Sequence, residues 1–225
     1  MRRWFTLIAL LGLVGANALG GDIAMFENLG FSDSADVFVF GQYGVTSEES
    51  NPFAEIYVVD VARNAFVSGG TFSYSSTDPL TLGQDGRGAL YTLLNEARPL
   101  LQREAVNHLS TGRPIYILVD GEEPRSRLTF RDFISDRRFD VRLEQDTRGS
   151  GDRTSAAFHI ELTITRADES VRTITVGRPS YYRDGISSYR ITQILVGPDE
   201  DSVVFVVERR APDGSIRYMV ETAPL

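Results

Sequence analysis

The sequence predicts a mostly β protein with a minor α component, built from β-propeller-like hairpins or as an irregular β-sandwich, with one kinked helix or helix pair inserted. Three features lead to this fold class. Apolar runs at residues 37–40 and 56–61, the second interrupted only by Asp60, indicate strands covered on both faces. Alternating apolar residues at 158–164 indicate a half-buried strand. A single stretch with helical spacing, at about residues 88–110, separates these groups of strands.

The N-terminal segment has the pattern of a signal peptide. Arg2-Arg3 precedes an apolar run from Trp4 to Val14, and Ala16-Asn17-Ala18 matches a small-x-small cleavage site. The apolar run is too short to cross a bilayer, so we expect no stable membrane insertion once residues 1–18 are removed. The alternative interpretation is a retained membrane anchor. The sequence therefore predicts export to a periplasmic or secreted location, with residues 19–225 forming one domain.

The composition limits the classes of partner. The 225 residues carry 31 acidic and 23 basic side chains, which gives a formal net charge of −8. Such a charge argues against nucleic acid, because phosphate binding needs a concentrated positive surface. The chain has no cysteine, which excludes disulfides and a lipid-modified cysteine. A domain of this length can bury a sufficient core without a metal or disulfide.

The first half of the domain contains strands followed by the helix. The apolar runs Val37–Phe40 and Ile56–Val61 are two strands, and a third strand is predicted to begin at Phe66. Leucine and alanine residues then recur at three- and four-residue steps over about residues 88–110. Pro99 removes an amide donor and crowds the preceding turn, which predicts a kink or two short helices.

The second half is strand-like from Ile115 onward. A half-buried strand at residues 139–143 is followed by a hairpin that turns at "RADES", Arg166 to Ser170. The last three predicted strands are Tyr189–Val196, Val203–Arg209 and Ile216–Thr222.

Two hairpins of the domain have similar sequences. A shift of 166 residues lays Val37–Phe40 on Val203–Val206, and Tyr57 then matches Tyr218 after a shorter link. The similarity suggests an internal repeat of blade-like hairpins. Chance similarity between short hairpins is the competing interpretation.

No complete catalytic or cofactor motif is present, and we expect no cofactor. The chain lacks a G-x-S-x-G elbow, and its two histidines, His108 and His159, have no cysteine to join them in a zinc site. His108 is expected on the apolar face of the helix and His159 on the polar face of a strand. Neither position indicates a serine triad.

Two acidic clusters allow alternative sites. Asp120, Glu122 and Glu123 follow a predicted strand, where the acids of a glycoside hydrolase can lie. A second cluster gathers oxygen ligands of the type that calcium prefers; it consists of Asp199, Glu200 and Asp201. Solvated turns are the competing interpretation of both clusters.

Aromatic and arginine side chains near predicted loops suggest a recognition surface. Amphipathic rings mixed with charges are typical of surfaces that bind proteins or glycans. The candidate residues are Tyr43, Phe53, Tyr181, Tyr182, Arg183 and Tyr189. The alternative is that these rings only cover the ends of strands.

These observations favour an exported soluble protein that acts as a non-catalytic binding or interaction module of the cell envelope. Its expected partner is an envelope protein or glycan. The alternative function is a carboxylate-dependent hydrolase acting on envelope glycan or peptidoglycan. The two functions can be distinguished because only hydrolysis requires the carboxylates of Glu122 and Glu123.

Several short motifs resemble a known family. They are Gly30-Phe31-Ser32, Tyr43-Gly44, Glu55-Ile56-Tyr57 with Asp60, and Tyr189-Arg190-Ile191. Together they are similar to a family of predicted secreted bacterial proteins of unknown function, domain of unknown function 2259, over nearly the whole mature chain.

The chain departs from the family pattern at two places. Ser32 to Ala35 reads "SDSA" where the family usually has "SPDG", and "GISSYRI" replaces a cysteine-proline pair before the last motif. The resemblance implies export and a β-rich architecture. It implies no mechanism.

Overall fold

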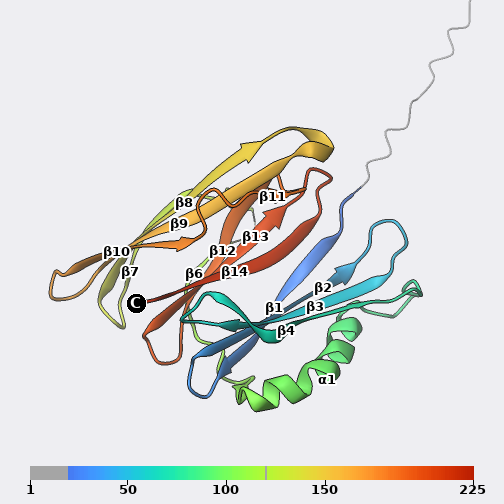
Figure 1. Cartoon of the computed structure of the whole chain (residues 1–225), viewed down its shortest axis with the longest axis horizontal. Coiled ribbons are helices and arrows are strands. Elements are labelled where there is room, and N and C mark those ends of the chain that lie inside the picture. Colours follow the sequence, from blue (N-terminus) through green and yellow to red (C-terminus); the bar gives the residue numbers. More distant parts are fainter. Residues whose placement is uncertain (1–19, 120) are drawn as a thin grey trace, which may run out of the picture.

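The computed structural model describes residues 20–119 and 121–225 (Figure 1). The predicted signal peptide, residues 1–18, and the candidate acid Asp120 lie outside the described residues.

The described residues form two β-sheets and one α-helix, α1 (Arg87–Arg103). The larger, nine-stranded sheet has the order β4 (Ala65–Ser75), β3 (Pro52–Asp60), β2 (Val37–Val45), β1 (Ile23–Ser32), β14 (Ile216–Pro224), β13 (Ser202–Arg210), β12 (Ser188–Val196) and β6 (Arg113–Ile117), and the short β5 (Val106–Asn107) pairs with β1. The smaller, five-stranded sheet has the order β10 (Val171–Gly177), β9 (Ser155–Thr165), β8 (Arg137–Arg148) and β7 (Arg127–Asp132), and β11 (Arg183–Asp184) pairs with β9. A 3-10 turn spans Gly151–Arg153.

The nine-stranded sheet consists of two antiparallel meanders. The first meander is β1 to β4, and the second is β12 to β14 with β6 at its edge. The meanders meet where β1 and β14 run parallel, with Ile23 opposite Ile216. Segments from the two ends of the described chain therefore lie side by side in one sheet.

Strand alternation divides the core into layers. On β2, Phe38 and Phe40 belong to a buried cluster that also contains Val204 and Val206 of β13. All four side chains are almost fully buried. The buried residues of this cluster come from β1 to β3, from the β3–β4 turn and from the second meander. The two meanders therefore pack against each other face to face. On its other face, β13 presents Phe205 to the five-stranded sheet. The layers thus follow the order α1, first meander, second meander and five-stranded sheet (Figure 1).

Helix α1 packs on the outer face of the first meander. Leu90, Leu93 and Ala97 are buried against β2 and β3, and Gly41 makes room for the helix because a Cβ there would lie 2.7 Å from Leu90 Cδ1. Pro99 lies within the helix on its exposed side, where the carbonyl that it leaves unpaired can reach water.

The stretch predicted to be helical, about residues 88–110, is helical only as far as Arg103. The chain leaves the helix through a left-handed residue, Ala105, and then forms β5. His108 therefore lies outside the helix and not on its apolar face; it is exposed, and its ring Nδ1 lies 2.6 Å from the carbonyl oxygen of Leu29.

The predicted fold class, mostly β with one helix, is confirmed, and the layered sheets are consistent with a β-sandwich. The similar hairpins β2–β3 and β13–β14 differ in register. Phe40 is paired with Tyr57, whereas Val206, its counterpart, is paired with Val220 and not with Tyr218. Within the described residues, no helix is both long and apolar enough to cross a bilayer.

Candidate functional site

Three of the six predicted surface residues are buried. Tyr43 is 5% exposed and accepts a hydrogen bond from Arg87 Nε at 2.8 Å. Phe53 is 7% exposed, with the guanidinium carbon of Arg217 4.0 Å from its ring centroid. Tyr189 is 3% exposed and donates its hydroxyl to a backbone carbonyl of β9. These rings support neighbouring elements and present little surface to a partner.

The other three residues are consecutive in the sequence: Tyr181 and Tyr182 lie on the link between β10 and β11, residues 178–182, and Arg183 follows them. The link begins with a turn in which the amide of Tyr181 donates to the carbonyl of Arg178. Tyr181 is half-exposed, and its successor Tyr182 lines a separate cavity. Arg183 starts β11 and lines the same cavity as Tyr181.

We call the first cavity the Tyr181 pocket. It has a volume of about 310 Å³ and is built from three distant parts of the chain: the β3–β4 turn, the β10–β11 link and β14. Its lining residues are Val59, Asn64, Ala65, Phe66, Arg178, Tyr181, Arg183, Met219, Val220 and Glu221. Apolar side chains with a few convergent polar groups are typical of small-ligand sites.

Two arginines flank the tyrosine ring. The guanidinium carbons of Arg183 and Arg178 lie 4.9 Å and 5.9 Å from the ring centroid of Tyr181. Arg183 also lies over the ring of Phe158, at 5.6 Å. Within the described residues, Arg178 makes no side-chain hydrogen bond or ion pair, so its five donors remain available to a ligand.

A buried carboxylate forms the polar end of the pocket. Glu221 is 6% exposed and accepts a short hydrogen bond from the side-chain amide of Asn64. Its Oε1 is 4.0 Å from the guanidinium of Arg183, a loose ion pair. Asn64 is itself fixed, because its Oδ1 accepts the backbone amide of Thr222 at 2.9 Å.

Burial raises the pKa of Glu221, and the Asn64 hydrogen bond and the two arginines offset only part of this effect. Since the folded state then binds the proton more tightly than the unfolded state, stability falls as pH rises above the ordinary glutamate pKa of about 4.3. Glu221→Gln should therefore raise the melting temperature at neutral pH by about 2 to 4 °C, equivalent to about 1 kcal/mol. The gain should disappear below about pH 4, where the native carboxyl is protonated.

Thermal denaturation at neutral and acid pH measures this effect. Glu123→Gln is the matched control, because Glu123 is exposed. At either pH this variant should change the free energy of unfolding by no more than about 0.5 kcal/mol. A Glu221→Gln protein that melts lower than wild type at neutral pH would show that the carboxylate stabilises the fold.

The second cavity surrounds Tyr182. The hydroxyl of Tyr182 donates a short hydrogen bond to Asp146, and the guanidinium carbon of Arg148 is 3.7 Å from its ring centroid. Glu144 and His159 are cross-strand neighbours in the same lining. The polar atoms of Tyr182 and Asp146 satisfy each other, which leaves them less available than Arg178.

The predicted acidic sites lie elsewhere. Glu122 and Glu123 are exposed, and Glu122 lines a cavity together with Glu208. In the Asp199–Asp201 turn, Glu200 receives the guanidinium of Arg113 at 2.7 Å. Among the described residues, no group of three histidine or acidic side chains is arranged to hold a metal ion. Because the carboxylate of Glu200 already pairs with Arg113, the interpretation of residues 199–201 as a surface turn is favoured over a calcium site.

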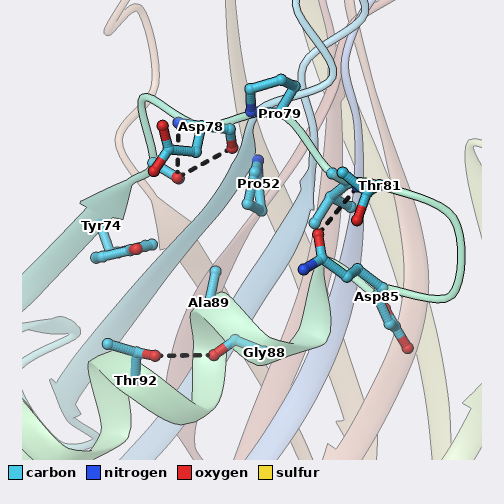
Figure 2. Close-up of a pocket in the computed structure, with 12 residues that line it drawn as sticks. Pro52, Tyr74, Asp78, Pro79, Thr81, Asp85, Gly88, Ala89 and Thr92 are labelled. Atoms are coloured by element: carbon cyan, nitrogen blue, oxygen red, sulfur yellow. Dashed lines mark hydrogen bonds between the residues drawn. The ribbon is translucent and has the colours of Figure 1, made fainter.

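A further cavity, of about 600 Å³, lies between the end of β4 and the first turn of α1 (Figure 2). Its polar groups pair locally: Ser76 Oγ with Asp78, and Thr92 Oγ1 with the carbonyl of Gly88. The amide of Thr81 is likewise satisfied, by the side chain of a lining glutamine. This cavity therefore presents fewer unpaired polar groups than the Tyr181 pocket.

Of the residues that line the Tyr181 pocket, the sequence analysis named Tyr181 and Arg183 as candidates and did not name Asn64, Arg178 or Glu221. Glu221 stands in an ordinary strand, and Asn64 reads as a turn residue. Only the packing of β14 against the β3–β4 turn brings them together. No local pattern in the sequence marks that contact.

Comparison with known proteins gives a family and no characterised relative. No curated protein and no solved structure matches the chain. One family model matches residues 39–223, which extend from within β2 to within β14. That family is described as predicted secreted proteins, in agreement with the export that the N-terminal segment predicts. The chain therefore belongs to the family of predicted secreted proteins known as DUF2259.

Proposed function

We propose that this protein is an exported, non-catalytic binding module of the cell envelope, periplasmic or secreted, that takes its ligand in the Tyr181 pocket. One observation carries the proposal: a half-exposed tyrosine ring lies beside two arginines above a buried carboxylate. Burial raises the pKa of Glu221, and carboxyl groups with a shifted pKa beside a cavity are typical of binding sites.

The pocket chemistry supports an acidic sugar as the ligand. A half-exposed tyrosine offers a flat amphipathic face to a sugar ring. Arg178 can hold a carboxylate in a bidentate pair, and Asn64 and Glu221 can hydrogen-bond hydroxyl groups. With Arg178 and Arg183 against Glu221, the pocket has an excess of one positive charge in a chain of net charge −8. That local contrast favours an anionic ligand.

The test compares two sugars that differ by a carboxylate. N-acetylmuramic acid carries a lactyl carboxylate that N-acetylglucosamine lacks, and both belong to peptidoglycan. Calorimetry should show binding of the acid at least about tenfold tighter than the neutral sugar, as expected for one charge-assisted pair. Arg178→Gln should remove most of this preference. Tyr181→Ala should weaken the binding of both sugars.

A matched tyrosine controls for surface effects. Tyr91 on α1 is 59% exposed, so Tyr91→Ala removes a similar ring away from the pocket and should leave binding unchanged. Equal affinity of wild type for the two sugars, or unchanged binding in Tyr181→Ala, would overturn the assignment of the pocket.

The hydrolase alternative has a separate measurement. Glu208, the buried carboxylate near Glu122, has an arginine on each oxygen: Arg190 at 2.5 Å and Arg210 at 2.6 Å. Both oxygens of Glu208 therefore already accept hydrogen bonds from arginine, which leaves the exposed Glu122 and Glu123 as the candidate acids. Release of reducing ends from peptidoglycan, lost in a Glu122→Gln and Glu123→Gln double variant, would favour hydrolysis over simple binding.

A further inference from the structure

The outer edge of β4 is an unprotected sheet edge. β4 ends the nine-stranded sheet, and among the described strands none pairs with it on the side away from β3. Its 11 residues contain neither a charged residue nor a proline. Edge strands usually carry such residues, because a free row of N–H and C=O groups otherwise pairs with another chain. β4 is therefore able to accept a further strand.

The other edges of the two described sheets carry such protection. β6, at the opposite end of the larger sheet, contains Arg113 and Pro114. In the smaller sheet, β7 contains arginine and aspartate residues, and β10 contains Arg172. The contrast indicates β4 as the edge at which this protein pairs with another strand.

The regular part of this edge is Thr71–Ser75, which we call the β4 edge strip. Before it, the pairing of β4 with β3 shifts register at a bulge that contains Gly69, a residue with a φ of +70°. After it, the amide of Leu80 donates to the carbonyl of Ser50, in the β2–β3 link, at 2.9 Å. The loop that follows β4 therefore runs across the end of β3, away from the strip.

The hydrogen-bond pattern of β4 directs alternate backbone groups outward. The amide of Ser76 donates to the carbonyl of Pro52 at 3.0 Å, and Ser75 lies opposite Phe53. Ser75 and Phe53 are therefore a non-hydrogen-bonded pair, and the even-numbered residues of the strip bond to β3. The N–H and C=O groups of the odd-numbered residues point away from β3; these exposed residues are Thr71, Ser73 and Ser75.

The strip is complementary to a second copy of itself. Its outward-facing residues are symmetric about Ser73, so two antiparallel strips with a two-fold axis at Ser73 would pair these residues through both of their backbone groups. Phe72 would then lie opposite Tyr74 of the second copy, and such aromatic pairs stabilise antiparallel sheets. No like charges meet in this register, because the strip has no charged side chain.

The aromatic side chains of the strip are only partly buried in a single chain. Phe72 and Tyr74 pack against the cluster between α1 and the first meander. Tyr74 also lines the large cavity at the first turn of α1, together with Pro52 and Ala89 (Figure 2). Phe72 of a second copy would pack on the outer side of Tyr74 and so remove more of this apolar surface from water.

We propose that this protein forms a two-fold dimer through the β4 edge strip, which joins the larger sheets of two copies into one continuous sheet. Each chain offers one such edge, so association closes at two copies. Because the strip is short, the dimer should form and dissociate reversibly with concentration. The strip shares no residue with the Tyr181 pocket, so dimerisation and ligand binding can fail independently.

Light scattering on the purified protein, expressed with its own N-terminal segment, measures the dimer. Dilution should lower the mean mass from two chains toward one. Ser73→Pro should keep the protein monomeric, because proline removes an outward N–H at the centre of the pairing and leaves the hydrogen bonds to β3 in place. Thr175→Pro is the matched control: Thr175 is exposed on β10 and its amide faces away from β9, so this variant should dimerise like wild type.

A cysteine cross-link tests the register without relying on proline. The chain has no cysteine, so Ser73→Cys introduces a single thiol. At the two-fold axis the Cα atoms of the two copies would be about 5.5 Å apart, within the range of a disulfide. The two copies of residue 75 would be about 14 Å apart along the strands, which makes Ser75→Cys the register control. Oxidation should couple chains of Ser73→Cys and leave those of Ser75→Cys single.

Three results would overturn the dimer. A wild-type chain that stays monomeric up to about 1 mM would leave the strip to a strand of another protein. A dimer that persists in Ser73→Pro would place the contact elsewhere on the surface. Equal cross-linking of Ser73→Cys and Ser75→Cys would contradict the two-fold register.

Discussion

Phe38→Ala is expected to lower the free energy of unfolding by about 3 to 5 kcal/mol, the range for a fully buried phenylalanine. Phe38 is 0% exposed and lies between the two meanders, with its ring centroid 4.7 Å from that of Phe31 and 6.4 Å from that of Phe40. Removing the ring leaves a cavity in the layer between the two meanders. Since ordinary domains are stable by about 5 to 15 kcal/mol, the variant should unfold at much lower urea concentration.

A surface phenylalanine provides the control. Phe133 is 84% exposed in the β7–β8 turn, so Phe133→Ala should change the free energy of unfolding by no more than about 0.5 kcal/mol. If Phe38→Ala were as mild as Phe133→Ala, the two meanders would not cover each other, and the layered fold described above would be wrong.

The layers could be anticipated from the sequence only in part. The unbroken apolar run Val37–Phe40 indicated a strand buried on both faces, and β2 does lie between α1 and the second meander. The helix was evident because Leu90, Leu93 and Ala97 keep a helical spacing. In both cases the spacing of apolar residues in the sequence indicates which side of the strand or helix is buried.

Other elements lack such a period. Strand β1 contains Asn28 and Gly30, where its pairing with β2 shifts register, and Gly30 has a φ of +100°. Asparagine and glycine are residue types that are common in turns, and here they form a β-bulge within the strand. Strand β7 is short and rich in charge. The parallel contact of Ile23 with Ile216 joins residues from opposite ends of the described chain, which no local pattern can show.

The residues of the candidate sites also divide into those that a local sequence pattern can indicate and those that it cannot. Exposed loop residues such as Tyr181 can be found from composition, because a ring among turn residues is unusual. A buried polar group such as Glu221 cannot, since its contacts depend on a neighbour more than a hundred residues away. Tyr43 and Phe53 show the converse: they flank a polar loop in sequence, yet both are buried.

One ion-pair cluster ties the two sheets together at their shared end. Arg113 on β6 holds Asp132 on β7 through two hydrogen bonds, of 2.8 and 2.9 Å. It also reaches Glu200 in the β12–β13 turn, whose carbonyl accepts Arg137 of β8 at 2.6 Å. The Asp132 side chain is only 4% exposed, so it depends on Arg113 for its charge balance.

Arg113→Ala should therefore lower the free energy of unfolding at neutral pH by about 3 kcal/mol, because it leaves a buried carboxylate without its cation. The Arg113 guanidinium, opposed by burial, holds the pKa of Asp132 well below its usual range. A depressed carboxyl pKa contributes stability above the ordinary aspartate pKa of about 3.9, and this contribution is lost as pH falls below that value. Urea unfolding should thus show a gap between wild type and Arg113→Ala that is wide at neutral pH and narrows below about pH 4.

The best control is an exposed pair with the same bidentate geometry. Arg127 binds Asp140 with two hydrogen bonds, of 3.0 and 2.6 Å, but its side chain is 57% exposed. Water and salt screen such a pair, so Arg127→Ala should change the free energy of unfolding by less than about 1 kcal/mol. Adding Asp132→Asn to Arg113→Ala should recover part of the loss, because a neutral amide needs no cation. Equal effects of Arg113→Ala and Arg127→Ala would mean that the buried cluster does not hold the sheets together.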